Sequence, residues 1–122
     1  MAFREWIGVD FDGTLVESTH KPGSAFVPYM VGRPVILMVN RVKSWLAQGK
    51  EVRIVTARAA STNSLAVANK QIIENWCEKM FGQKLTVTSE KDPWMIELWD
   101  DLAIQVVPNT GWRIDGKNNE VW

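Results

Sequence analysis

Two aspartates separated by a single residue are the feature of this chain best suited to chemistry. Asp10 and Asp12 follow the apolar run of residues 6–9 and precede Gly13. The apolar run predicts a buried strand, and the glycine predicts a sharp turn directly after it. Side chains at i and i+2 of an extended segment share one side, so both carboxylates can reach the crevice at the strand's carboxyl end. Like charges this close favour a bound divalent cation or a proton on one group, and either predicts a functional site.

A solvated acidic turn or a calcium-binding loop is the plain alternative for this segment. The rest of the chain separates these interpretations, because a functional site needs further polar residues at the ends of other strands.

Composition limits the class of protein. A chain of 122 residues predicts one domain, residues 1–122, with a sizeable core. Its 14 Lys and Arg balance 14 Asp and Glu, so no net charge draws it to nucleic acid or to an anionic membrane. No apolar run approaches the ~20 residues that span a bilayer, and the first residues lack the order of a secretory signal. The single cysteine, Cys77, excludes an internal disulfide and favours the cytoplasm. The sequence gives no indication of an oligomer.

Alternating strand and helix patterns predict the fold. Apolar and β-branched runs predict strands, and apolar residues at three- and four-residue steps predict helices that end at glycines. This alternation is typical of a parallel sheet flanked by helices. Between the first strand and the first helix, residues 16–34 are rich in proline and predict a loop or flap. The further strands are expected at residues 51–56, 85–88 and 95–99, and the helices at residues 34–49 and 61–82.

The C-terminal part departs from this pattern. Residues 103–107 read as a strand, but only about three residues separate them from the preceding one, too few for a parallel crossover. We therefore expect an antiparallel strand or a hairpin edge there. Residues 112–122 predict a small hairpin around Asp115 and Gly116.

Polar side chains stand at or just beyond the ends of the other predicted strands. They are Thr56, Lys91 and the pair Asp100 and Asp101. Taken singly, these residues read as a strand-end hydroxyl, a turn lysine and a helix cap. The carboxyl ends of parallel strands meet at one edge, so the joint arrangement predicts that all of them converge with the first aspartate pair.

In this order the motifs resemble those of the haloacid dehalogenase (HAD) superfamily of phosphotransferases. The first motif is similar to residues 10–14, the second to residues 54–56, the third to Lys91 and the fourth to residues 99–101. The resemblance spans roughly residues 5–107. It implies an α/β, three-layer Rossmann-like fold of HAD type, with a mostly parallel central sheet and helices on both faces.

A narrower resemblance links the chain to small HAD-like phosphatases encoded by bacteriophages. It rests on Thr56-Ala57-Arg58 and on residues 107–111. The intervals between the motifs have no room for a separate cap domain, so we expect a capless enzyme with an open site.

The resemblance also implies roles for the acidic residues. Asp10 would be the nucleophile that forms an aspartyl-phosphate, and Asp12 would act as general acid and then as general base. Mg²⁺ would be held by Asp10, by the backbone carbonyl of Asp12, and by Asp100 with or without Asp101. The sequence leaves open which of that last pair contacts the metal.

The polar and basic residues would hold the substrate. Thr56 and the backbone N–H groups that follow it, beginning at Ala57, would bind the phosphoryl oxygens, and Lys91 would add a positive charge. Lys84 is the alternative to Lys91. Arg58 would reach an anionic part of the substrate or would be an ordinary surface charge.

The sequence therefore predicts a Mg²⁺-dependent phosphatase. An open site suits a bulky phosphorylated substrate such as a nucleotide or a polynucleotide end, with no role for a membrane. The alternatives are a non-catalytic phosphate-binding or phosphoacceptor module, as in receiver domains, and a phage-encoded interaction protein on the same fold. The Asp-x-Asp spacing after the first strand, and the lack of Asp in the strand at residues 52–56, favour the enzyme.

Overall fold

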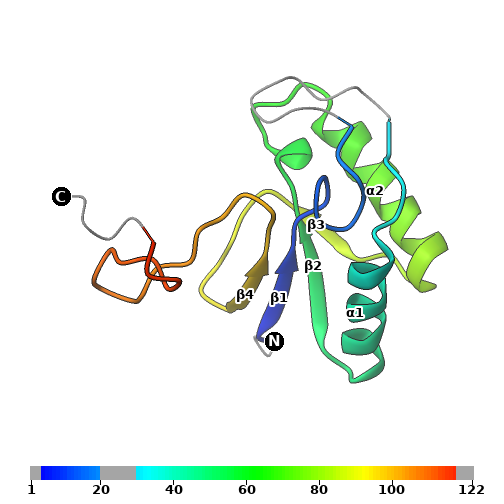
Figure 1. Ribbon diagram of the computed structural model, residues 1–122. Coiled ribbons are helices and arrows are strands. Elements are labelled where there is room, and N and C mark those ends of the chain that lie inside the picture. The colour runs from blue at the N-terminus through cyan, green and yellow to red at the C-terminus, as the bar shows by residue number, and fades with distance from the viewer. Residues whose placement is uncertain (1–3, 20–29, 118–122) are drawn as a thin grey trace.

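A four-stranded parallel sheet forms the centre of the computed structural model, which describes residues 4–19 and 30–117 (Figure 1). The strand order is β3-β2-β1-β4, and every pairing is parallel. The α/β class and the parallel sheet predicted from the sequence are confirmed. The strands are β1 (Trp6–Val9), β2 (Glu51–Val55), β3 (Thr86–Thr88) and β4 (Met95–Trp99), and the helices are α1 (Ile36–Ala47), the 3₁₀ turn η1 (Ala57–Ala59) and α2 (Ala66–Phe81).

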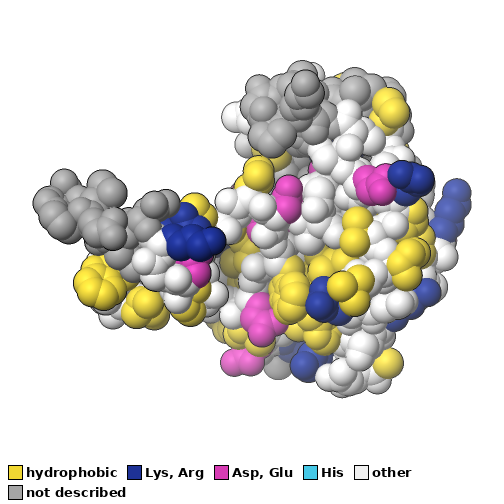
Figure 2. Space-filling view, viewed as in Figure 1, with side chains coloured by type: hydrophobic (Ala, Val, Ile, Leu, Met, Phe, Trp, Pro, Cys, Tyr) yellow, Lys and Arg dark blue, Asp and Glu magenta, His cyan; other side chains and the backbone are white. Residues whose placement is uncertain are grey.

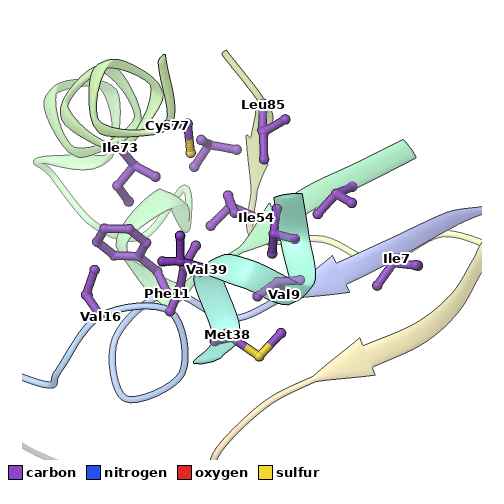
Figure 3. Packing of buried hydrophobic residues seen from close by; sticks show 14 residues of the cluster. Ile7, Val9, Phe11, Val16, Met38, Val39, Ile54, Ile73, Cys77 and Leu85 are labelled. Carbon is purple, nitrogen blue, oxygen red and sulfur yellow. The ribbon is translucent and has the colours of Figure 1, made fainter. Parts of the chain in front are cut away.

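Both α-helices cover the same face of the sheet. The chain steps from β1 through α1 to β2 and through α2 to β3, always in one direction across the sheet. Right-handed crossovers that step in one direction place their helices on one face. Figures 1 and 3 show α1 and α2 side by side on that face. The expectation of helices on both faces is therefore wrong for the described residues.

The hydrophobic core lies between these helices and the sheet. Alternate strand residues point into it, because side chains along a strand alternate between the two faces. They meet one apolar stripe from each helix (Figure 3). Each such side chain stabilises the fold by about 1.5–3 kcal/mol when fully buried. The central members are Ile7, Val9, Val52, Ile54 and Val87 from the strands, with Met38, Val39, Val42, Ile73 and Cys77 from the helices.

The opposite face is crossed by a coil, residues 89–94, that carries the chain from β3 to β4. Asp92 of this coil accepts a hydrogen bond of 2.8 Å from the indole Nε1 of Trp6. It also pairs with Arg53 at 3.3 Å, and the Arg53 guanidinium lies 4.5 Å from the centre of the Trp6 ring. These contacts hold the coil against the face of the sheet opposite the two helices, and the coil positions β4.

Both helices end as expected, but α2 begins late. Gly49 and Gly82 follow the two helices with φ of 78° and 76°, the left-handed conformation that glycine adopts readily. The predicted start of the second helix near residue 61 is wrong, because α2 begins at Ala66. Before it the Asn63 side chain accepts a hydrogen bond of 2.9 Å from the Leu65 N–H and holds a turn.

The C-terminal residues form a hairpin that stands away from the sheet (Figure 1). Val107 N–H donates to the Trp112 carbonyl at 2.7 Å, and Ile114 N–H donates to the Gln105 carbonyl at 2.9 Å. The strand expected at residues 103–107 is absent from the described chain; only an isolated antiparallel bridge joins Val106 to Arg113, outside the sheet. The turn of the hairpin lies at residues 108–111. A further turn forms near Asp115, where the Gly116 N–H donates to the Arg113 carbonyl at 3.1 Å, but residues 118–122 lie outside the described part, so the hairpin over residues 112–122 stays a prediction. We call residues 103–117 the arm.

Only the two ends of the predicted flap at residues 16–34 are described. Glu17 N–H donates to the Arg33 carbonyl at 2.8 Å, so these ends lie side by side, whereas residues 20–29 lie outside the described part. In the described residues, neither α1 nor α2 has the length and apolar character needed to cross a membrane.

Candidate functional site

Three aspartates meet at the carboxyl ends of β1 and β4. The Asp10 N–H donates to the Trp99 carbonyl at 2.8 Å, which aligns the end of β1 with the end of β4. Asp100 and Asp101 follow directly after Trp99. As a result, one carboxylate oxygen from each of the three aspartates lies within 4.8 Å of the others. Residues about ninety positions apart in the sequence therefore form one acidic cluster, as the motif order predicted.

The turn after β1 is shaped to admit Asp101. Gly13 has a φ of 85°, and a Cβ atom on it would lie 2.8 Å from Cγ of the Asp101 carboxylate. A side chain at this position would therefore strain the backbone and collide with the acidic cluster. Thr14, in the same turn, donates its hydroxyl to Asp10 Oδ2 at 3.3 Å. The Gly-Thr pair of the first motif thus supports the cluster directly.

The crowding of carboxylates raises the pKa of Asp10 to about 8. Burial is the largest cause, followed by a hydrogen bond with the Asp101 carboxyl group and by the negative charge of Asp100. A proton on Asp10 is one way to relieve this repulsion, and a cation is the other. The donors are carboxylate oxygens, which hard divalent cations such as Mg²⁺ prefer. The residues present therefore fit the metal that the sequence predicted.

The Asp12 side chain does not belong to this cluster. Its two carboxylate oxygens accept hydrogen bonds from Arg58 Nε and Nη2, both at 2.7 Å. The Arg58 side chain is fully buried and that of Asp12 nearly so. Arg58 thus lies behind Asp12 and is not among the residues that line the cavity. The reading of Arg58 as a surface charge is wrong, and a metal contact through the Asp12 backbone carbonyl stays a prediction.

Thr56 lies at the end of β2, where the sequence placed it, and is buried. Its N–H donates to the Thr88 carbonyl at 2.8 Å, which ties it to the end of β3. Its hydroxyl accepts a hydrogen bond of 3.2 Å from the Arg58 N–H and so caps η1. Both Thr56 and Ala57 line the cavity described below.

Neither lysine considered from the sequence lines that cavity. Lys91 is exposed on the coil after β3. Lys84 precedes β3 and therefore lies at the amino end of the strand, away from the acidic cluster. Ser89, the first residue after β3, lines the cavity instead. Sequence reasoning missed Ser89 although the same strand-end rule indicates it. It also missed Ser18, for which no periodic pattern gives a signal.

A cavity of 340 Å³ opens directly beside the acidic cluster. Among the described residues that line it, four are aspartates and none is Lys or Arg. The negative charge of this lining therefore repels anions. An anionic ligand needs a cation between itself and the carboxylates. The lining consists of Asp10, Asp12, Ser18, Val55, Thr56, Ala57, Ser89, Asp100, Asp101 and Leu102.

Comparisons with protein-family models, with curated protein sequences and with solved structures give no match to this chain.

Proposed function

We propose that this protein is a Mg²⁺-dependent phosphohydrolase of HAD type that cleaves phosphate monoesters through an aspartyl-phosphate on Asp10. The observation that carries the proposal is the convergence of Asp10, Asp100 and Asp101 within 4.8 Å beside an open cavity. The first and fourth motifs of the resemblance supply these three residues. The parallel sheet, with these motifs at the carboxyl ends of β1 and β4, agrees with the proposed fold.

The acidic cluster would hold the metal through carboxylate oxygens of Asp10, Asp100 and Asp101. Mg²⁺ bound there supplies the positive charge that lets a carboxylate approach an anionic phosphate. The cavity lining supports this role, because its described residues include four aspartates and no basic side chain.

In the first step, an oxygen of Asp10 attacks the phosphorus atom and forms a P–O bond. The bond from phosphorus to the leaving oxygen breaks, and its electron pair stays on that oxygen. We assign Asp12 the role of the general acid that gives a proton to the leaving oxygen. The product alcohol departs, and the phosphoryl group remains on Asp10.

In the second step, a water molecule attacks the phosphorus atom of the aspartyl-phosphate. Asp12 accepts a proton from that water, the bond between phosphorus and the Asp10 oxygen breaks, and inorganic phosphate leaves. Arg58 occupies one lone pair on each Asp12 oxygen, and each oxygen retains a second lone pair for this proton. Arg58 therefore acts as a positioning residue that orients Asp12.

The end of β2 would hold the phosphoryl oxygens. Thr56 and Ala57 line the same cavity as the acidic cluster. Hydroxyl and backbone N–H donors aimed at a phosphoryl group stabilise the negative charge that spreads over its oxygens during transfer. The open cavity leaves space for a large leaving group, so we include nucleotides and oligonucleotide ends in the proposed substrate class.

A phosphoacceptor module is the second candidate, and the Asp12–Arg58 pair is the observation that favours it. If Arg58 prevents Asp12 from activating water, the first step proceeds and the second stalls. A protein of this kind accumulates phospho-Asp10 in place of releasing phosphate through many turnovers.

The test is hydrolysis of para-nitrophenyl phosphate with Mg²⁺, with EDTA, and with EDTA followed by excess Mg²⁺. We expect turnover that EDTA abolishes and Mg²⁺ restores, and its loss in Asp10→Asn. Glu78→Gln, which removes an exposed carboxylate on α2, is the matched control and should keep wild-type activity. Metal-independent turnover, or full activity in Asp10→Asn, would refute the proposal. A single burst of one para-nitrophenol per chain, with the phosphate retained on the protein, would select the phosphoacceptor.

A panel of phosphorylated substrates then defines the leaving group. Nucleoside monophosphates, sugar phosphates and 3′- or 5′-phosphorylated oligonucleotides should be compared by kcat/KM. Preference for the nucleotides supports the proposed class, whereas preference for the small sugars contradicts it.

A further inference from the structure

The arm carries apolar side chains that find no cover in the described part of the chain. Ile104, Trp112 and Ile114 are each about 60% exposed, at 59%, 60% and 60%. Figure 2 shows hydrophobic side chains gathered on the arm where it stands out from the body. Contiguous exposed apolar side chains of this size mark a binding surface more often than single ones do.

The hairpin of the arm is held by few contacts between its two sides. Two backbone hydrogen bonds, from Val107 to Trp112 and from Ile114 to Gln105, join its two sides, which form an isolated bridge and no strand. An isolated two-stranded hairpin is at best marginally stable in water and needs a further strand or an apolar surface. The arm therefore requires a partner surface.

Such a surface exists at the outer edge of β4. This strand ends the described sheet, so only its inner side pairs, with β1. Ile96 and Leu98 of β4 are exposed, and a groove of 570 Å³ separates the strand from residues 103–105. An unpaired strand edge beside a groove with both apolar and acidic side chains is the kind of site that accepts an added strand.

We propose that two copies of this chain form a dimer with a two-fold axis. In this dimer the arm of each copy docks in the groove beside β4 of the other copy. One chain carries both complementary parts, an apolar hairpin and an open apolar strand edge. The reciprocal exchange covers both arms and both β4 edges, so the assembly stops at a dimer.

The area available agrees with a stable dimer. Seven large apolar residues on β4 and the arm retain about half of their surface, which gives roughly 250–500 Å² of apolar area per copy. Since apolar atoms supply about 60% of an interface, the whole contact is roughly 400–800 Å² per copy, near the size of a specific interface. The residues are Ile96, Leu98, Ile104, Val106, Val107, Trp112 and Ile114.

Charge favours the same pairing. Glu97 and Asp100 line the groove and make it acidic. The arm carries Arg113 and Lys117 against Asp115, an excess of one positive charge. Opposite potentials of this kind fix the orientation of docking more than they add to affinity.

The first test is the mass of the full chain in solution, measured by sedimentation equilibrium from 1 to 100 µM. We expect a dimer for the wild type, and at least a tenfold weaker dimer for Ile104→Asp and Trp112→Asp. Val67→Asp is the control, because Val67 is 83% exposed on α2, outside the arm and the groove. A wild-type monomer at 100 µM, an open series of larger species, or a dimer that the arm variants leave unchanged would overturn the proposal.

Cysteine cross-linking tests the exchange itself. Burial raises the pKa of the native Cys77 thiol to about 12, so this residue stays protonated and unreactive near neutral pH. We expect Ile96→Cys and Ile114→Cys chains to form a disulfide-linked pair when mixed under mild oxidation. Neither variant alone should cross-link to the same extent. Efficient self-linking of Ile96→Cys would instead indicate β4 against β4 and would contradict the arm exchange.

Discussion

Magnesium binding should release a proton from Asp10, and the pKa of Asp10 sets the number of protons released per site. Burial and the neighbouring carboxyl groups raise the pKa of Asp10 to about 8 in the metal-free protein. At pH 7, one unit below that value, about nine in ten molecules therefore carry the proton. A carboxyl group must lose its proton to ligate a metal, so binding at pH 7 should displace about 0.9 of a proton per site.

The affinity follows from the same equilibrium. Below pH 8 each unit of pH changes the deprotonated fraction about tenfold, so the apparent affinity for Mg²⁺ should rise about tenfold per unit. Above pH 8 the affinity should level off, because Asp10 is already ionised. At pH 9 only about 0.1 of a proton remains to be released.

Calorimetric titration with Mg²⁺ in two buffers of different ionisation heat measures both quantities. The difference in heat between the buffers gives the number of protons released at each pH. In Asp10→Asn we expect weak binding with no proton release near pH 7, and in the control Glu78→Gln we expect wild-type behaviour. Equal affinity at pH 6 and pH 8, or proton release that persists in Asp10→Asn, would refute the reasoning.

Four further outcomes follow from the same contacts. The pKa of Asp10 rises from 3.8 to about 8 on folding, so its stabilising contribution is complete below pH 3.8 and is lost as pH rises through 8. Metal-free Asp10→Asn should thus melt at a higher temperature than wild type at pH 9 but not at pH 4, as checked by thermal unfolding. Arg58→Met should lower the free energy of unfolding by about 3–5 kcal/mol in urea titrations, because it leaves Asp12 buried without its ion pair. Arg58→Lys should retain more of that stability yet lose kcat, since one ammonium cannot match two parallel hydrogen bonds. Gly13→Ala should weaken Mg²⁺ binding at least tenfold by displacing Asp101, a loss that calorimetry detects in folded protein.

The elements that position the acidic cluster were predictable because they depend on local pattern. Apolar runs ended at Asp10 and Asp100, and parallel pairing brings such ends to one edge of the sheet. The glycine stops at Gly49 and Gly82 were equally local, because each supplies a left-handed residue after a helix.

The contact between Asp12 and Arg58 was not predictable from pattern. The two residues are 46 positions apart, and nothing in the sequence near Arg58 separates a buried arginine from an exposed one. Its burial depends on the path of η1 behind the turn after β1, which is a tertiary property. Lys91 illustrates the converse, because its place in the motif order agreed with the resemblance while the coil from β3 to β4 left it exposed.

The number of layers also depended on strand order, which periodicity does not encode. A third crossover helix would have covered the second face, but only the coil of residues 89–94 connects β3 to β4. Residues 103–107 had the composition of a strand, and such a run gives the same signal whether it pairs in a sheet or, as here, forms only an isolated bridge.

One feature of the topology links the acidic cluster to the arm. The chain returns across the sheet after β3 and places β4 on the far side of β1, so that Asp100 and Asp101 reach Asp10. The same move makes β4 the last strand of the described sheet, with an unpaired outer edge and an apolar segment following it. If the arm paired with that edge in its own chain, it would cover the groove and could not dock on a second copy. The position that completes the acidic cluster thus leaves the surface that we propose a second copy covers.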